Sequence, residues 1–178
     1  YYTGGNKYRS FYKALEYAVA ALDDEVDFSK YDYDNDGVID TIYFIYAGFG
    51  QADTLDESTI WPHQSTMKQY GITLDGKEFG PYATSNELTG LCYGKPNKVI
   101  DGIGTFVHEY GHVLGLPDLY DPNYKQNSIT PGYWSTMCSG CYNMEKHRPA
   151  LFSAYEKWLC KWTEPEYIVE GTEYELLT

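Results

Sequence analysis

The feature that most limits what this chain can fold into is the stretch HEYGHVLGLPD at residues 108–118. Side chains four residues apart on an α-helix lie one turn apart on the same face, so His108 and His112 can bind one metal ion together. Gly115 can take the left-handed conformation that ends a helix and turns the chain. The spacing therefore predicts a helix, followed by a turn that brings Asp118 back as a third metal ligand.

The donor types in this stretch predict a catalytic zinc ion. Zinc is bound by imidazole nitrogen and carboxylate oxygen, and three protein ligands leave a fourth position for water. Glu109 lies next to the first histidine, where its carboxylate can act as general base toward that water. A purely structural zinc is disfavoured, because structural sites normally have four protein ligands. The alternative reading is a surface helix that carries two histidines by chance.

The same helix is expected to face the core with an apolar stripe. Five apolar residues fall within a narrow sector at 100° per residue, on roughly the opposite side from the two histidines. These residues are Ile103, Phe106, Val107, Tyr110 and Leu114.

Two elements are expected in the first part of the chain. Residues 11–22 have one apolar helical face, and Ser10 before them is a residue type that favours a helix N-cap. Residues 41–47 (TIYFIYA) are a nearly continuous run of β-branched and aromatic side chains. Such a run is typical of a strand that is buried on both faces.

Two further elements are expected later in the chain. Asp75-Gly76 has the composition of a two-residue hairpin turn, here between strands near 70–74 and 78–84. A last helix is expected to have Pro149 in its first turn, where proline costs no hydrogen bond. Its apolar stripe is formed by Leu151, Phe152, Tyr155, Trp158, Leu159 and Trp162.

An acidic segment at residues 32–40 (DYDNDGVID) predicts a calcium site. Carboxylates at alternate positions with a glycine at the sixth position are typical of EF-hand-like loops, which bind calcium through hard oxygen ligands. Position twelve is Tyr43 rather than glutamate, so the loop is not a complete EF-hand. The alternative is a solvated acidic turn before a strand. The expected calcium ligands are Asp32, Asp34, Asp36, Asp40 and the backbone oxygen of Val38.

Length and charge exclude several classes of protein. The chain has 178 residues, enough for one domain with a sizeable core, and a net charge of −13. This charge argues against nucleic acid and anionic membranes as partners. The sequence has no apolar run long enough to cross a membrane and no visible signal peptide. The chain opens on Tyr1 rather than methionine, so we expect it to be part of a longer precursor.

The cysteines leave several possibilities open. Four cysteines permit three disulfide pairings, and structural disulfides or free thiols are the favoured interpretations. A redox CxxC motif is disfavoured because the thioredoxin-like βαβ context is missing, and a second zinc site lacks a second CxxC. The four residues are Cys92, Cys138, Cys141 and Cys160.

A methionine downstream of the expected zinc site adds to the pattern. The segment GYWSTM at residues 132–137 places Met137 nineteen residues after Asp118. Metzincin peptidases have a methionine turn under the zinc, downstream of the third ligand. The order and spacing here fit that arrangement.

With these motifs, the chain resembles the catalytic domain of the immune-inhibitor-A family of secreted bacterial metallopeptidases, a metzincin-like group. The resemblance is carried by four stretches in the right order: DFSKYDYDNDGVIDTIYFIYAGFGQA, STIWPH, GTFVHEYGHVLGLPDLYD, and GYWSTM followed by RPALFSAYEKWLCKW. It implies zinc and bound calcium, with His108, His112 and Asp118 as zinc ligands and Glu109 as general base. Metzincins place an oxyanion-stabilising Tyr two residues after the Met, where this chain has Ser139; Tyr142 is the candidate to serve instead.

The resemblance also implies a fold and a biological setting. We expect an α+β, metzincin-like zincin: a twisted mixed sheet with an active-site helix, and a small, mostly irregular or helical C-terminal subdomain. The catalytic domain would span residues 1–166, without the strands that normally precede the first helix, and 167–178 would start a following β segment. We expect a secreted, monomeric zinc endopeptidase acting on proteins or peptides. The rival is a non-catalytic, peptidase-like binding or adhesion module.

Overall fold

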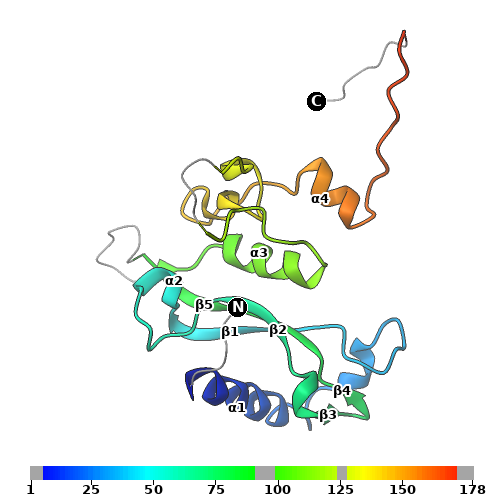
Figure 1. Ribbon diagram of the computed structural model, residues 1–178. Coiled ribbons are helices and arrows are strands. Elements are labelled where there is room, and N and C mark those ends of the chain that lie inside the picture. The colour runs from blue at the N-terminus through cyan, green and yellow to red at the C-terminus, as the bar shows by residue number, and fades with distance from the viewer. Residues whose placement is uncertain (1–5, 91–98, 124–127, 172–178) are drawn as a thin grey trace.

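The computed structural model describes residues 6–90, 99–123 and 128–171 (Figure 1). It combines helices with a four-stranded mixed sheet, as the sequence predicted, and no described helix is long and apolar enough to cross a membrane. The α-helices are α1 (Asn6–Ala20), α2 (Gln51–Thr54), α3 (Ile103–Val113) and α4 (Ala154–Leu159). The 3-10 helices are η1 (Phe28–Tyr31), η2 (Lys68–Tyr70), η3 (Gly132–Trp134) and η4 (Ser139–Tyr142). The strands are β1 (Ile42–Phe49), β2 (His63–Thr66), β3 (Thr73–Leu74), β4 (Lys77–Glu78), β5 (Pro81–Thr89) and β6 (Val99–Ile100).

Strand β5 is the centre of the main sheet. It pairs in parallel with β1 and antiparallel with both β2 and β6. Thr84 illustrates the register, because it lies opposite Phe44 on β1 and His63 on β2. The continuous buried run lies here, over residues 82–86.

The expectation that β1 is buried on both faces is wrong. Ile45, in the middle of β1, is 65% exposed. In the described part of the chain β1 is an end strand of the sheet, and only one of its faces packs against the buried core: Ile42, Phe44 and Tyr46 do so, whereas Ile45 and Ala47 alternate with them and are exposed. The apolar composition of the run did not distinguish an end strand from a central one.

Helix α1 packs against one face of the sheet and α3 lies over the other (Figure 1). The buried side chains of α1 are Phe11, Leu15 and Val19, in the core that also contains Tyr82 of β5. The expected apolar face is therefore confirmed for these three residues, whereas Leu22 lies beyond the helix and is exposed. The helix begins at Asn6, so the prediction of an N-cap at Ser10 is wrong.

The predicted hairpin turn is confirmed, but its strands are shorter than expected. Asp75 and Gly76 have φ values of 47° and 77°, the left-handed pair that a two-residue hairpin requires. The turn joins the two-residue strands β3 and β4, which pair only with each other among the described strands. The longer strand β5 begins after them, at Pro81.

The chain beyond α3 has short helices and irregular segments, as expected for the C-terminal part. Helix α4 begins later than predicted, because Ser153 rather than the proline four residues earlier marks its N-terminus. Leu151, expected on its apolar stripe, lies outside the helix and is 82% exposed. Residues 167–171 form no strand, and the rest of the predicted β segment lies outside the described residues.

Candidate metal centre

The turn after α3 brings the predicted third ligand back to the helix. Gly115 has φ +91°, and its N–H donates to the carbonyl of His112 at 3.0 Å. The N–H of Leu116 donates to the carbonyl of Gly111, also at 3.0 Å. These two bonds form a Schellman cap, which reverses the chain direction at the helix end. Asp118 follows directly on the returning segment, as the sequence predicted.

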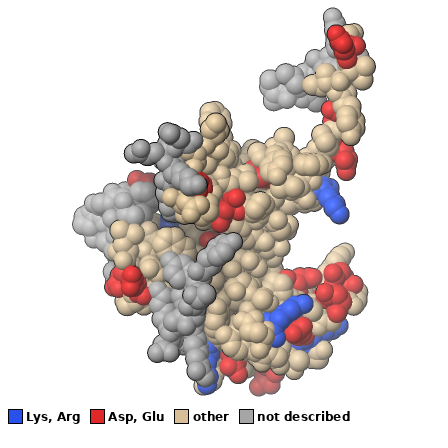
Figure 2. Space-filling view, in the orientation of Figure 1, with Lys and Arg blue, Asp and Glu red and all other residues tan. Residues whose placement is uncertain are grey.

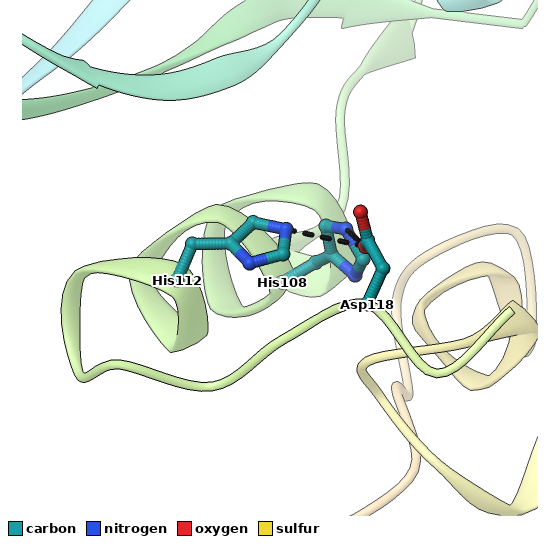
Figure 3. Close-up of side chains that lie close together, drawn as sticks. All are labelled: His108, His112 and Asp118. Atoms are coloured by element: carbon teal, nitrogen blue, oxygen red, sulfur yellow. Dashed lines mark ion pairs between the residues drawn. The ribbon is translucent and has the colours of Figure 1, made fainter. Parts of the chain in front are cut away.

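The three candidate ligands converge on one point (Figure 3). One carboxylate oxygen of Asp118 lies 3.2 Å from Nε2 of His108 and 3.2 Å from Nε2 of His112. One donor atom from each residue lies within 4.8 Å of the other two. Such a set of two imidazoles and a carboxylate has the ligand types of a zinc site with an open fourth position.

Backbone carbonyls fix which ring nitrogen is available to a metal. The Nδ1 atom of His108 lies 2.9 Å from the carbonyl oxygen of Thr136, and that of His112 lies 2.8 Å from the carbonyl oxygen of Leu116. A carbonyl oxygen only accepts, so each Nδ1 must carry the hydrogen. In a neutral ring the lone pair is then on Nε2, the atom that points at Asp118.

The Asp118 carboxylate favours positive charge on the two imidazoles beside it. Burial lowers the pKa of His108, but its hydrogen bonds with Asp118 and Cys141 and the charge of Glu109 raise it to about 11. Burial raises the pKa of Asp118, whereas hydrogen bonds from both histidines hold it well below the usual range. Positive charge is therefore strongly favoured where the two imidazoles meet the carboxylate, and a divalent metal ion fits that demand.

Glu109 is placed and tuned for proton transfer. Its side chain is only 6% exposed. Burial raises its pKa to about 7, although the neighbouring His108 and His112 act in the opposite direction. A carboxyl group with a pKa near neutrality is well suited to take up and release a proton at physiological pH.

The predicted apolar stripe of α3 is not its most buried face. Ile103 is 59% exposed; Phe106, Tyr110 and Leu114 are also exposed, and Val107 is half-buried. The buried residues of the helix are Gly104, Glu109 and Gly111.

Two glycines of α3 allow the segment around residues 137–141 to approach the helix closely. A Cβ atom on Gly104 would lie 1.9 Å from the carbonyl oxygen of Cys141, and one on Gly111 would lie 2.4 Å from Sδ of Met137. The C-terminal segment therefore contacts α3 directly at these two positions.

Met137 packs directly against α3, the helix that carries the two candidate histidine ligands. It is fully buried, and its carbonyl oxygen accepts a hydrogen bond from the N–H of Leu119 at 2.8 Å. Tyr142, the other supporting candidate, lies in η4 and is partly exposed, and its role stays a prediction.

The acidic loop brings three of its five expected ligand residues together. Asp32, Asp34 and Asp36 each place one carboxylate oxygen within 4.8 Å of the others. The Asp32 carboxylate is buried and lies 2.6 Å from the ammonium of Lys77, a hydrogen bond that lowers its pKa. The Asp40 carboxylate instead accepts the N–H of Tyr33 at 3.0 Å.

Within the acidic loop, the N–H of Val38 donates a hydrogen bond to the Asp36 carboxylate at 2.8 Å. Gly37 has the left-handed φ of +90° that the turn requires.

Acidic groups with basic groups among them gather at the end of the molecule where Figure 1 shows β3 and β4 (Figure 2).

The described cysteines are free thiols. Cys138 and Cys141 are buried, Cys160 is partly exposed, and Cys92 lies outside the described residues. For the described cysteines the structure thus selects the second of the two favoured interpretations.

Comparison with known proteins decides the family. The model of the immune inhibitor A peptidase M6 catalytic domain matches residues 16–165, which is most of the chain. The chain belongs to this family of metallopeptidases. The resemblance found in the sequence is thereby confirmed, and with it the classification as a zinc metallopeptidase of zincin-like fold.

Two relatives illustrate how the family is organised. The chain is 31% identical over 157 residues to immune inhibitor A of Bacillus thuringiensis subsp. alesti, which covers 78% of this chain and 23% of that protein. It is 30% identical over 140 residues to the pre-pro-metalloprotease PrtV of Vibrio cholerae serotype O1, which covers 72% of this chain and 15% of that protein. The chain thus corresponds to less than a quarter of the length of these relatives.

Sequence reasoning missed the residues that support the ligands. The carbonyl groups of Leu116 and Thr136 carry no sequence signal, because every residue has one. Glu156 of α4, which is fully buried, is the third such residue. Its signal was available: Ser153 followed three residues later by glutamate has the pattern of a capping box.

Proposed function

We propose that this chain is the catalytic domain of a secreted zinc endopeptidase, in which His108, His112 and Asp118 hold the zinc and Glu109 is the general base. One observation carries the proposal: a single carboxylate oxygen of Asp118 lies 3.2 Å from Nε2 of both histidines. The Nδ1 hydrogen bonds already orient both rings for metal binding.

Zinc bound by these three residues would supply a Lewis acid that polarises the scissile carbonyl and lowers the pKa of water. The protein residues do the proton transfer. The Glu109 carboxylate takes the proton of the attacking water and then delivers it to the leaving amine nitrogen. Its burial and its pKa of about 7 support both directions of transfer at neutral pH.

The substrate class and the setting follow from the family. A peptidase acts on peptide bonds, so proteins or peptides are the substrates. The relatives are much longer proteins, one of them named a pre-pro-metalloprotease. We infer that this chain acts outside the cell, as the metzincin-like catalytic part of a longer precursor.

Calcium is proposed as a second ion, bound in the loop 32–40. Asp32, Asp34 and Asp36 supply carboxylate oxygens, and Asp40 and the carbonyl of Val38 are the remaining candidates. The proximity of three carboxylate oxygens supports this, since the Lys77 ammonium offsets the charge of only one of them.

A single substitution tests the proposed mechanism. In Glu109→Gln the side chain keeps its shape but cannot accept a proton, so we expect full zinc content and an about 10³-fold slower digestion of casein. Glu25→Gln, at an exposed position, is the matched control and should behave as wild type.

Each other outcome would contradict one part of the proposal. Wild-type digestion by the Glu109→Gln variant would remove Glu109 from the mechanism. Zinc-loaded wild-type protein that digests no protein substrate would favour the non-catalytic binding module instead. Wild-type protein that binds no zinc would contradict the metal centre itself.

A further inference from the structure

A three-residue segment, 135–137, forms backbone hydrogen bonds to one proposed ligand and to the residue next to another. Its members Ser135, Thr136 and Met137 are all fully buried. The carbonyl oxygen of Thr136 accepts the Nδ1–H of His108 at 2.9 Å. The carbonyl oxygen of Met137 accepts the N–H of Leu119 at 2.8 Å, next to the ligand Asp118. The position of this segment therefore sets the orientation of one ligand and the path of the chain at another.

The carboxyl group of Glu156 holds segment 135–137 in place. Its Oε1 atom accepts the hydroxyl of Ser135 at 2.6 Å and lies 3.4 Å from the N–H donor of Met137. The Ser135 hydroxyl oxygen in turn accepts the same N–H of Met137 at 3.0 Å. The other carboxyl oxygen, Oε2, accepts the N–H of Ser153 at 2.5 Å. One side chain thus links the segment under the ligands to the start of α4.

We propose that Glu156 is a positioning residue for the metal centre. It acts through segment 135–137, whose two carbonyl groups orient His108 and fix the chain beside Asp118. The inference rests on the zinc centre proposed above and adds a residue that lies outside the ligand set. Groups that hydrogen-bond to metal ligands typically change metal affinity 10- to 100-fold when removed.

A helix cap alone does not account for the placement of Glu156. Capping a helix requires only the bond from Oε2 to the N–H of Ser153, and such glutamates can lie at the surface. Here the carboxyl group is fully buried, which costs free energy unless hydrogen bonds compensate. Among the described residues no Lys, Arg or His forms an ion pair with it. The donors of segment 135–137 supply the compensation that the cap does not.

The contribution of Glu156 to segment 135–137 can be tested separately from its contribution to the cap of α4. Ser135→Ala removes the hydroxyl that donates to Oε1 and leaves the cap of α4 intact. Ser153→Ala weakens the cap, because it removes the hydroxyl that accepts the backbone N–H of Glu156 at 3.3 Å, and it leaves the segment intact, so it is the matched control. Glu156→Ala removes the carboxyl group from both the segment and the cap. The full chain is loaded with zinc or cobalt, and two properties are measured: the zinc dissociation constant by chelator competition, and the visible absorption spectrum of the cobalt form.

We expect Ser135→Ala and Glu156→Ala to weaken zinc binding by about tenfold and to shift the cobalt absorption bands. We expect Ser153→Ala to lower the melting temperature while keeping the zinc affinity and the cobalt spectrum of wild type. If Glu156→Ala does not fold, Ser135→Ala decides alone.

A wild-type spectrum and affinity in Ser135→Ala would overturn the inference. So would an equal loss of zinc affinity in Ser153→Ala, because the effect would then come from general destabilisation. In both cases the wild-type protein still binds metal, so the proposed function stands. Wild-type protein that binds neither zinc nor cobalt would overturn both.

Discussion

At the scale of single residues, the two proposed histidine ligands are oriented by carbonyl groups of two different origins. His112 bonds to Leu116, four residues away in the same turn. His108 bonds to Thr136, which lies 28 residues away. The spacing of residues 108–118 was sufficient to predict that His108, His112 and Asp118 come together, because a helix and its cap are local structure. The orientation of His108 was not predictable, because it depends on tertiary contact.

The assignment of the third ligand can be tested against its acidic neighbour. A carboxylate oxygen of Asp118 lies 3.2 Å from Nε2 of both histidines. The Asp121 carboxylate instead accepts the N–H of Asn123 at 2.8 Å and the hydroxyl of Ser128. We expect Asp118→Ala to lose its zinc, because two imidazoles alone bind the ion weakly. We expect Asp121→Ala to keep its zinc and to melt at a lower temperature, because it loses the hydrogen bonds to Asn123 and Ser128.

The measurement is zinc content per chain after dialysis, together with the thermal midpoint. Asp121→Ala serves as the control for Asp118→Ala, since both remove a carboxylate from the same segment. Full zinc in Asp118→Ala, or loss of zinc from Asp121→Ala, would show that the ligand was assigned wrongly.

At the scale of the elements, the existence of a segment was more predictable than its buried face. Helix α3 was expected from HEYGH, but its buried residues are Gly104, Glu109 and Gly111 rather than those of its apolar stripe. Hydrophobic periodicity reports which side chains are apolar, and it does not report where another backbone approaches closely. The start of α4 lies later than predicted for a different reason: Pro149 suits the first turn of a helix, but the capping box of Ser153 and Glu156 marks the actual start.

The acidic loop gives a test at this scale. Because calcium would bind the folded loop only, saturating calcium should stabilise the protein by RT ln(1 + [L]/Kd), about 2.7 kcal/mol at a hundredfold excess over Kd. For a chain of this size that corresponds to a rise in Tm of roughly 5 to 10 °C. Asp34→Asn, within the loop, should reduce the rise.

Thermal melting with calcium or with a chelator measures this effect. Asp24→Asn is the control, because Asp24 is exposed and lies outside the loop. If calcium does not change the melting temperature of the wild-type protein, the loop is only an acidic turn and the calcium proposal is wrong. Magnesium at the same ionic strength separates specific binding from charge screening.

At the scale of the whole molecule, the main sheet lies between α1 on one side and α3 on the other, and the C-terminal segments pack on α3 (Figure 1). The sequence predicted the mixed sheet and the active-site helix, since both follow from local patterns. It did not predict that β5 rather than β1 is the buried central strand. Strand order depends on pairing between distant segments, which composition does not encode. The proposed metal centre lies where α3, its returning turn and segment 135–137 meet.

The central claim is that one zinc ion is held by His108, His112 and Asp118 with Glu109 beside it. X-ray diffraction from crystals of the zinc-loaded protein, with data collected at the zinc absorption edge, tests this most directly. We expect one anomalous peak about 2.0–2.1 Å from Nε2 of both histidines and about 2.0–2.2 Å from a carboxylate oxygen of Asp118, with Glu109 outside bonding distance. A peak bonded to Glu109 or Asp121 in place of Asp118, or a peak elsewhere in the molecule, would contradict the account.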